Sequence, residues 1–183
     1  MTVLETSLPG VLVIEPRLFS DERGFFFESF NVKDFSEVAN VDYDFVQDNH
    51  SKSSRGVLRG LHYQIQRPQG KLVRVTEGAV LDVAIDIREG SPNFGDWVGI
   101  ELSESNMRQL WIPPDFAHGF LVLSEAAQVL YKATDYYAPE YERTLKWDDP
   151  SIGIDWPELD IPPLLSQKDQ EACFLSEADL PRL

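Results

Sequence analysis

The sequence has little of several residue types, and each shortage excludes a class of protein. Its 183 residues include one cysteine, Cys173, which excludes an internal disulfide, a CxxC redox pair and a cysteine-based zinc site. No apolar run approaches the roughly 20 residues that span a bilayer. The opening segment, MTVLETSLPG, lacks the basic start and apolar core of a secretion signal. We therefore expect a cytoplasmic protein with no membrane partner.

Basic residues are also scarce, and they are unevenly distributed. The chain has 16 Lys and Arg against 31 Asp and Glu, a net charge of −15, so we expect no nucleic-acid partner. Residues 49–76 are the exception, because they contain no acidic residue. Two interpretations of this segment stay open: a chance basic loop, or a pocket for a small anion such as phosphate. Its basic residues are Lys52, Arg55, Arg59, Arg67, Lys71 and Arg74.

The signatures of several common enzyme classes are absent, namely GxGxxG, GxxxxGK[ST], GxSxG and HExxH. Short strand-like segments dominate instead. In residues 80–87 the apolar Leu81, Val83 and Ile85 alternate with other residues, which is the period-2 pattern of a strand with two different faces. Comparable segments, separated by Gly, Pro, Asn or Ser, occupy residues 11–14, 25–30, 43–47, 71–76, 97–102, 108–112, 118–123 and 128–137.

Few helices are expected beside these strands. Asn31 can cap a short helix that runs through Val38, and Ser166 can cap a C-terminal helix from Gln167 to about Ala172. Many short strands without alternating helices favour an antiparallel sandwich or barrel. No repeat or flexible linker interrupts the chain, so the prediction is one domain, residues 1–183, that is mainly β and of jelly-roll type.

Only three histidines are available for chemistry: His50, His62 and His118. Metal-binding jelly rolls, the cupins, generally present an HxH pair, a nearby Glu and a distant third His. Here the corresponding triplet is His62-Tyr63-Gln64, in which a neutral amide replaces the second imidazole. Losing ligands leaves a poor site for a first-row metal, so we expect no metal. The alternative use of each histidine is an ordinary hydrogen-bonded position in the core or at the surface.

Ten sequence blocks carry a specific resemblance that runs nearly end to end. They are SDERGFFFESF (20–30), FVQDNHS (45–51), VLRGLHYQ (57–64), QGKLVRV (69–75), VLDVAIDI (80–87), SPNFGDWVG (91–99), RQLWIPPDFAHGFLVLSE (108–125), LYKATDYYAPEYE (130–142), WDDPSIGIDWP (147–157) and LSQKD (165–169). With these blocks the chain closely resembles the dTDP-4-dehydrorhamnose 3,5-epimerase family. The resemblance implies a cupin-type jelly roll, a homodimer, and no metal or other cofactor.

It also implies an activity, the conversion of dTDP-4-dehydro-6-deoxy-D-glucose to dTDP-4-dehydro-L-rhamnose in L-rhamnose biosynthesis. The C4 ketone of such a sugar acidifies the C–H bonds at C3 and C5. Epimerisation then needs a base, a group that stabilises the enolate oxygen, and an acid on the opposite face. No redox cofactor is required, in agreement with the missing dinucleotide motif.

The resemblance places these roles on particular residues. His62 matches the base, Asp169 its carboxylate partner, Tyr131 the proton donor and Lys71 the enolate stabiliser. Each has an ordinary alternative: Asp169 could cap the last helix from the Ser166-Gln-Lys-Asp169 box, Tyr131 could be a core aromatic, and Lys71 could be a surface lysine.

Further positions match residues that contact the nucleotide or sugar. His118 would line the same pocket, with Asp82 as a possible orienting partner, and Arg59 would suit a diphosphate oxygen. Family N-terminal strands extend to a second subunit, so some of these residues would serve the partner's site, and Phe26 or the tyrosine pair could stack on thymine. The positions are Arg23, Phe26, Glu28, Gln47, Asn49, Arg59, Lys71, His118, Tyr136, Tyr137, Glu142 and Lys168.

Other functions stay open beside this one. A relative could invert only one centre or move the ketone between C3 and C4, because small shifts of the base or acid change the outcome. A metal-dependent cupin oxygenase and a sugar-binding jelly roll are alternatives from other classes. The residues between His62 and Lys71, Arg67 among them, carry no transferable role.

Overall fold

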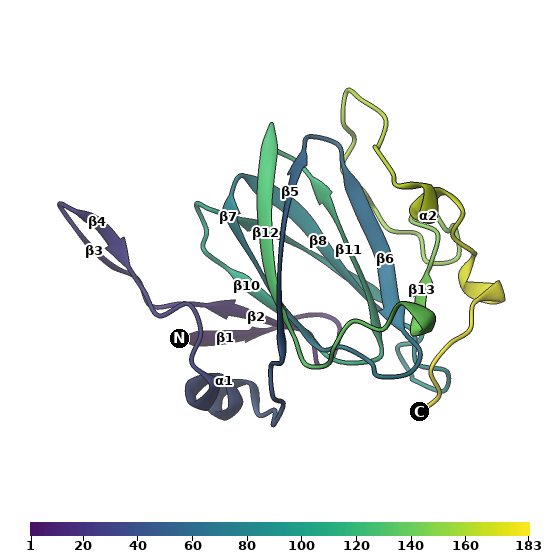
Figure 1. Cartoon of the computed structure of the whole chain (residues 1–183), viewed down its shortest axis with the longest axis horizontal. Helices are drawn as coiled ribbons and strands as arrows, with labels where there is room; N and C mark the ends of the chain where they lie inside the picture. Colours follow the sequence, from purple (N-terminus) through teal and green to yellow (C-terminus); the bar gives the residue numbers. More distant parts are fainter.

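A computed structural model describes residues 1–183, apart from the side chain of Val38, and its main feature is two antiparallel sheets packed face to face (Figure 1). This arrangement confirms the predicted mainly β jelly roll. The six-stranded sheet has the order β1 (Thr2–Glu5), β2 (Leu12–Glu15), β10 (Gln109–Ile112), β7 (Lys71–Glu77), β12 (Ala126–Ala133) and β5 (Gln47–Ser54). The five-stranded sheet has the order β13 (Glu142–Thr144), β6 (Leu58–Gln64), β11 (Phe116–Val122), β8 (Ala79–Asp86) and β9 (Trp97–Ser103).

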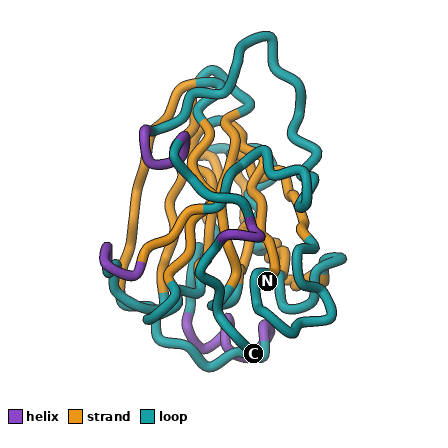
Figure 2. The backbone as a smooth tube through the Cα atoms, turned by 90° about the vertical axis from the view of Figure 1, so that its right-hand side faces the viewer, coloured by secondary structure: helices purple, strands orange, loops and turns teal.

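The remaining elements lie around these sheets. The hairpin of β3 (Phe19–Asp21) and β4 (Gly24–Phe26) projects away from the body of the molecule (Figure 1). The helical elements are α1 (Val32–Ala39), η1 (Pro139–Tyr141), α2 (Gln167–Gln170) and η2 (Leu175–Glu177). Both chain ends lie toward the same, lower end of the molecule (Figure 2). None of the helices in the described structure is long and apolar enough to cross a membrane.

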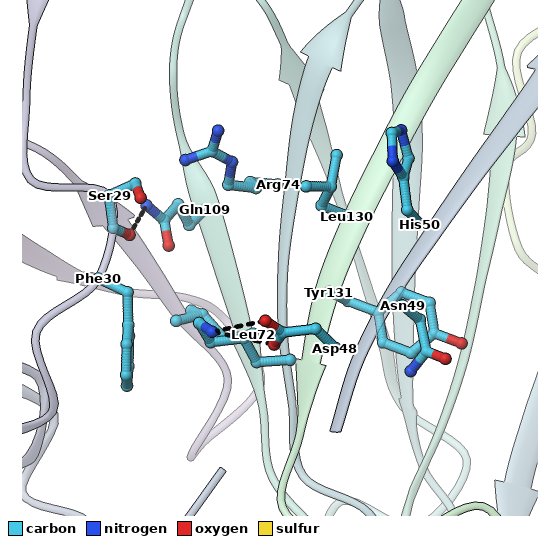
Figure 3. Close-up of a pocket in the computed structure, with 11 residues that line it drawn as sticks. Ser29, Phe30, Asp48, Asn49, His50, Leu72, Arg74, Gln109, Leu130 and Tyr131 are labelled. Carbon is cyan, nitrogen blue, oxygen red and sulfur yellow. Dashed lines mark hydrogen bonds and ion pairs between the residues drawn. The ribbon is translucent and has the colours of Figure 1, made fainter. Parts of the chain in front are cut away.

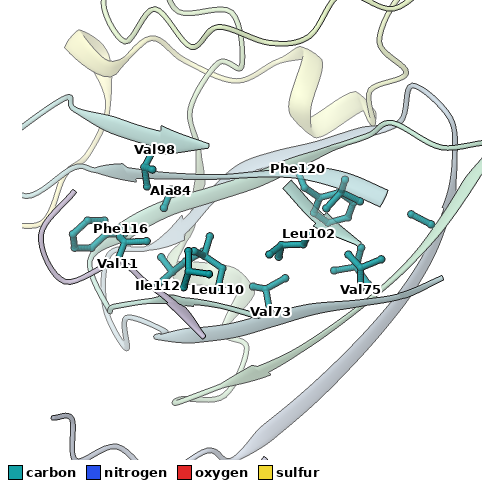
Figure 4. Packing of buried hydrophobic residues seen from close by; sticks show 14 of the residues in the cluster. Val11, Val73, Val75, Ala84, Val98, Leu102, Leu110, Ile112, Phe116 and Phe120 are labelled. Carbon is teal, nitrogen blue, oxygen red and sulfur yellow. The ribbon is translucent and has the colours of Figure 1, made fainter. Parts of the chain in front are cut away.

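The main core lies between the two sheets, where apolar side chains from both inner faces meet (Figure 4). Val73 and Val75 of β7 alternate with residues of the outer face, as the period-2 geometry of a strand requires. Phe120 of β11 contributes from the opposite sheet. A fully buried side chain of this kind stabilises the fold by about 1.5–3 kcal/mol, so this cluster holds the sheets together. Tyr131 packs at the edge of the cluster.

The C-terminal segment packs on the outer face of the five-stranded sheet. Leu175 of η2 joins a second cluster that includes Leu61 and Tyr63 of β6. The Tyr63 hydroxyl also donates a hydrogen bond to the carbonyl oxygen of Asp179 at 2.7 Å. These contacts hold the end of the chain beside β6, and they bring α2 next to the strand that carries His62.

Four local predictions were wrong, one of them the strand expected over 128–137, which ends at Ala133. Residues 43–46 form no strand; the strand begins at Gln47 and runs to Ser54, with the polar sequence QDNHSKSS. Its polarity hid it, because one face is exposed and the other lines a polar part of the interior. The strand expected over 25–30 ends at Phe26, and the C-terminal helix ends at Gln170 rather than near Ala172.

Candidate active site

Polar side chains from both sheets face the interior at one part of the lumen between the sheets. In an antiparallel ladder, directly paired residues share a face. Tyr131 pairs with the core residue Val73 and with Asn49, so both polar side chains point inward from the six-stranded sheet. His62 pairs with His118 in the five-stranded sheet. The lumen therefore has a tyrosine on one wall and two histidines on the other.

His62 and Asp169 are in direct contact, because Nε2 of His62 lies 2.6 Å from Oδ1 of Asp169. Asp169 is only 2% exposed. Burial lowers the pKa of His62, and the hydrogen bond with Asp169 offsets this only in part. The imidazole is consequently neutral near pH 7 and able to accept a proton.

Asp169 also belongs to the cap of α2. The Ser166 hydroxyl accepts a hydrogen bond from the Asp169 backbone N–H at 3.2 Å and donates one to Oδ2 of the same residue at 2.8 Å. Burial raises the pKa of Asp169, but the hydrogen bonds from His62 and Ser166 and the charge of Lys168 outweigh it, so the net shift is downward. Both interpretations of Asp169, cap residue and histidine partner, are therefore compatible with its contacts.

Lys71 is a buried lysine rather than the surface lysine of the alternative interpretation, since it is 7% exposed. Its Nζ lies 3.5 Å from the carbonyl oxygen of His62. Burial lowers the pKa of Lys71 to about 8, against the opposing charges of Asp82 and Glu142. An ammonium in this position can stabilise negative charge that develops beside His62.

Tyr131 is held in its protonated form. Burial raises the pKa of its phenol, and the negative charge of Glu142 raises it further, while the charge of Arg59 lowers it. A phenol that keeps its proton at neutral pH can act as an acid toward a strong base such as an enolate.

His118 forms a second histidine–carboxylate pair. Its Nε2 lies 2.9 Å from Oδ1 and 3.0 Å from Oδ2 of Asp82, and both residues are buried. Asp82 is thus the residue that orients His118 in this structure.

The amide of Gln64 stands where a metal-binding jelly roll would have its second imidazole. Its Nε2 donates to the Arg67 carbonyl oxygen at 2.7 Å, and its Oε1 accepts from the Ala138 N–H at 2.8 Å. Both ends of the amide are therefore engaged with backbone groups. Among the residues that the structure describes, no group of three or more His, Cys, Asp or Glu side chains could hold a metal ion.

A relay of amides ends beside Tyr131. The Tyr137 backbone N–H donates to Oε1 of Gln47 at 2.9 Å, and Nε2 of Gln47 donates to Oδ1 of Asn49 at 3.1 Å. A backbone N–H can only donate, so it fixes the orientation of both amides. The Nδ2 of Asn49 is left buried and without a partner within the described residues. Figure 3 shows Asn49 and Tyr131 turned to the same side of their sheet. Asn49 therefore presents a hydrogen-bond donor to the lumen.

Glu142 and Lys168 form an ion pair whose charges act on Tyr131 and His62. Oε1 of Glu142 lies 2.8 Å from Nζ of Lys168, and its Oε2 accepts a hydrogen bond from the Tyr137 hydroxyl at 3.0 Å. Tyr136 and Tyr137 are both about half exposed, in agreement with a place at the rim.

Three of the expected binding residues lie away from the rest. Arg23 and Phe26 are on the projecting hairpin, and Glu28 follows it. The Arg23 side chain is 85% exposed and pairs with Asp21, and Phe26 is 71% exposed. The structure of one chain does not bring these residues to its own lumen.

The basic residues of segment 49–76 do not gather into one anion pocket, which excludes the second of the two interpretations left open for this segment. Lys52 pairs with Glu77, Arg55 with Asp160 and Arg67 with Asp135. Lys52 lies on the exposed face of β5, whereas Arg55 and Arg67 lie in turns outside the strands, so the three side chains point in different directions. Of the other three, Lys71 is buried in the lumen, Arg59 leaves β6 on the inner face but is exposed, and Arg74 lines the pocket on the outer face of the six-stranded sheet.

Sequence reasoning missed Ser53 altogether. It named Gln64 but missed the hydrogen bonds of its amide with backbone groups. Ser53 accepts a hydrogen bond from Nε of Arg59 at 3.0 Å. The signal for Ser53 was present in the alternation of Gln47, Asn49, Ser51 and Ser53, which places these polar residues on one strand face.

The fold is a jelly roll, and its lumen has a histidine–aspartate pair opposite a tyrosine. A base and an acid on opposite walls are the groups that an acid–base isomerase requires, so fold and site together define this class of protein. A sequence model of the dTDP-4-dehydrorhamnose 3,5-epimerase family matches residues 5–177. The chain belongs to the dTDP-4-dehydrorhamnose 3,5-epimerase family.

Individual relatives agree with this assignment. A dTDP-4-dehydrorhamnose 3,5-epimerase of Pseudomonas aeruginosa is 58% identical over 179 residues, which is 98% of each chain. The crystal structure of dTDP-6-deoxy-D-glucose-3,5-epimerase from Legionella pneumophila, in complex with dTDP-4-keto-L-rhamnose, matches with a TM-score of 0.97 and 52% identity over 100% of this chain and 98% of that one. A 3′-monoepimerase from Streptomyces bikiniensis in complex with dTDP-quinovose has a TM-score of 0.91 and 36% identity, covering 100% and 93%.

Proposed function

We propose that this protein converts dTDP-4-dehydro-6-deoxy-α-D-glucose to dTDP-4-dehydro-β-L-rhamnose by inverting C3 and C5, a step of dTDP-L-rhamnose biosynthesis. One observation carries the proposal: the His62–Asp169 pair and Tyr131 come from opposite walls of one lumen. Inversion at carbon requires proton removal from one face and proton delivery to the other, and this arrangement supplies a base and an acid on the two sides.

The reaction proceeds in the same way at each carbon. The neutral imidazole of His62 takes the proton from the carbon next to the C4 ketone, and the C–H electron pair moves into an enolate whose negative charge rests on the C4 oxygen. The Lys71 ammonium stabilises that oxygen. Tyr131 then returns a proton to the opposite face of the carbon, and the electron pair re-forms the ketone. Solvent restores the proton of Tyr131 and removes the one on His62, so each carbon loses one proton and gains one.

The pKa directions support these roles. The lowered pKa of His62 keeps the base neutral, and the raised pKa of Tyr131 keeps the acid protonated. Asp169 holds the imidazole in place and stabilises the imidazolium once it forms. Lys71 lies beside the His62 backbone, close to where the C4 oxygen would sit if His62 faces C3 or C5.

The other lumen residues bind the substrate in this proposal. Asn49 and His118 contact the sugar, since both lie on the walls that carry Tyr131 and His62. Arg59 binds the diphosphate, because a guanidinium fork matches phosphate oxygens. The remaining contacts are made from the rim by Gln47, Tyr136, Tyr137, Glu142 and Lys168.

We include a homodimer in the proposal, with Arg23, Phe26 and Glu28 acting in the partner's site. An isolated two-stranded hairpin is at best marginally stable in water, yet β3–β4 projects with Phe19, Phe25 and Phe26 more than half exposed. The outer face of the six-stranded sheet also carries a pocket of about 280 Å³ lined partly by Phe30 and Leu130. A second copy that covers this face and receives the hairpin would bury both surfaces.

Residues 1–183 act as one domain in this proposal, since residues from Leu8 to Val129 share a single cluster and the C-terminal segment packs on β6. A cytoplasmic location is also proposed, because a chain with one cysteine gains nothing from an oxidising compartment.

The test is proton exchange on the 4-keto sugar nucleotide in D2O, followed by NMR at C3 and C5 after treatment of the protein with a chelator. Exchange at both carbons with formation of the L-rhamno product is the expected result. Exchange at one carbon alone would establish the second candidate, a mono-epimerase, which the likeness to the Streptomyces bikiniensis enzyme keeps in view. Loss of all activity with the chelator would contradict the proposal.

A further inference from the structure

Ser53 contacts the guanidinium of Arg59 across the short turn that joins β5 to β6. Ser53 lies on β5, is 7% exposed, and accepts a hydrogen bond from Nε of Arg59 at 3.0 Å. Since β5 and β6 belong to different sheets, this bond joins the two walls. The charge of Arg59 also lowers the pKa of Tyr131, which places the guanidinium near the proton donor.

The backbone that carries Arg59 is fixed as well. Gly60 follows it with a φ of +128°, and a Cβ at Gly60 would lie 2.5 Å from Cα of Gly119. The two strands therefore approach closely at a point that excludes any side chain. Arg59 pairs with the core residue Phe120, so its side chain leaves β6 on the inner face.

The hydrogen bond to Ser53 determines which pair of guanidinium nitrogens of Arg59 stays free to bind an anion. A guanidinium can offer two forks to an anion, Nε with one Nη, or the two Nη nitrogens together. Ser53 occupies Nε, and neither Nη nitrogen has a protein partner among the described residues. The fork that remains is the end pair, whose spacing matches two oxygens of one phosphate group.

We propose that Ser53 is a positioning residue for Arg59, which it holds with the two Nη nitrogens directed at the diphosphate of the substrate. The proposal rests on the proposed function, because it takes the ligand to be a nucleoside diphosphate sugar. Ser53 itself contacts neither the sugar nor the reacting atoms. The competing explanation is that Ser53 is only a small residue needed for packing beside its strand partner Ala127.

A double-mutant cycle on dTDP binding separates these explanations. The variants are Ser53→Ala, Arg59→Ala and the pair together, with Ser54→Ala as the matched control, because Ser54 is an exposed neighbour on the opposite face of β5. Titration calorimetry gives Kd for dTDP, and steady-state kinetics on the sugar nucleotide gives KM and kcat. The thermal midpoint of each variant is measured in parallel.

The expected result for Ser53→Ala is a Kd for dTDP raised about five-fold, the effect of one net hydrogen bond, with kcat changed less than about two-fold. Ser53→Thr, which keeps the hydroxyl, restores binding. In the Arg59→Ala background the same change has no further effect on Kd, because the positioned group is gone.

Two results would overturn the proposal: unchanged dTDP binding in Ser53→Ala, or an equal loss with and without Arg59, which would make Ser53 a packing residue. Failure of the proposed function has a different signature. A wild-type protein that binds dTDP but does not epimerise the sugar would contradict the reaction while leaving the Ser53 result readable from Kd.

Discussion

At the scale of single residues, the three histidines lie in three different environments. His62 contacts a buried carboxylate and His118 contacts another, whereas His50 is exposed on the outer face, where its Nε2 lies 2.7 Å from the side-chain oxygen of Gln128. Composition alone treats the three as equal. Strand alternation and long-range contacts, which join residues 107 positions apart in the case of His62 and Asp169, distinguish them.

The base assignment predicts that His62→Ala loses deuterium exchange at both C3 and C5, by at least about 10²-fold, the usual contribution of a general base. Exchange in D2O followed by NMR measures this directly. His50→Ala is the matched control, because His50 faces away from the lumen. It lies in the outer-face pocket that the proposed second copy covers, so light scattering first checks that the variant is still a dimer, and the dimer then retains wild-type exchange. Full turnover by the His62→Ala protein would refute the assignment.

Tyr131→Phe should act differently, because the variant keeps the base but lacks the proton donor. We expect deprotonation of the carbon to continue while reprotonation on its opposite face slows. Exchange of the original proton for solvent deuterium should therefore be faster than formation of the inverted product. The ratio of exchange to inversion, measured on one sample, checks this. Equal losses in both quantities would assign Tyr131 to substrate binding instead.

The pKa of Lys71 predicts a falling limb in the pH profile of kcat/KM. The ammonium stabilises the enolate only while it is protonated, and it loses its proton as the pH rises through about 8. Activity should therefore fall above about pH 8, below the range in which Tyr131 with its raised pKa would ionise. On the acid side, burial lowers the pKa of His62 and so keeps the base neutral to a lower pH than an exposed imidazole. Lys71→Met should have much lower activity, and its kcat/KM should no longer fall near pH 8. If the fall persists in this variant, it belongs to the titration of another group.

At the scale of elements, the sequence predicted strands well where their residues alternate or are β-branched, as in β8. It failed at β5, whose eight residues are all polar. Propensity reports how a residue suits a half-buried sheet with one apolar face, and a strand that is polar on both faces does not follow it. For the candidate site, resemblance to the family's motifs was enough to predict His62, Tyr131 and Asp169. The orientation of the Asn49 amide could not be predicted, since it depends on a backbone N–H of Tyr137, 88 positions along the chain from Asn49.

The close approach of β6 and β11 gives a stability prediction. Gly60→Ala would add a Cβ 2.5 Å from Cα of Gly119 and 2.8 Å from the His118 carbonyl oxygen, so the two strands must separate. We expect a loss of more than about 2 kcal/mol in the free energy of unfolding, which denaturant titration measures. Gly90→Ala is the control, because Gly90 has a φ of +95° but no atom within 4 Å of the added Cβ. The Gly90→Ala variant therefore measures the cost of a side chain at positive φ alone, a loss of about 1 kcal/mol in the free energy of unfolding. Similar losses for the two variants would show that the strand contact is not tight.

At the scale of the whole molecule, the position of the hairpin determines where Arg23 acts. Its strands project from the body, and the Arg23 side chain pairs only with Asp21 within the described chain, although the resemblance assigns Arg23 a contact with the nucleotide or sugar. A residue cannot contact a ligand in a lumen that it does not reach. The two observations agree if the hairpin enters the site of a second copy, with C2 symmetry so that each copy donates one hairpin and receives one.

This arrangement predicts complementation between two inactive variants. His62→Ala lacks the base but has an intact hairpin, and Arg23→Ala has the base but a defective hairpin. When the two are unfolded and refolded together, half of the dimers are hybrids, and each hybrid has one site with both an intact base and an intact hairpin. Activity should return to about a quarter of the wild-type value per chain. Light scattering confirms that each variant is a dimer, and separately refolded samples mixed afterwards are the control. If the hairpin served its own chain, every site in the hybrid would carry a defect, and mixing would restore nothing.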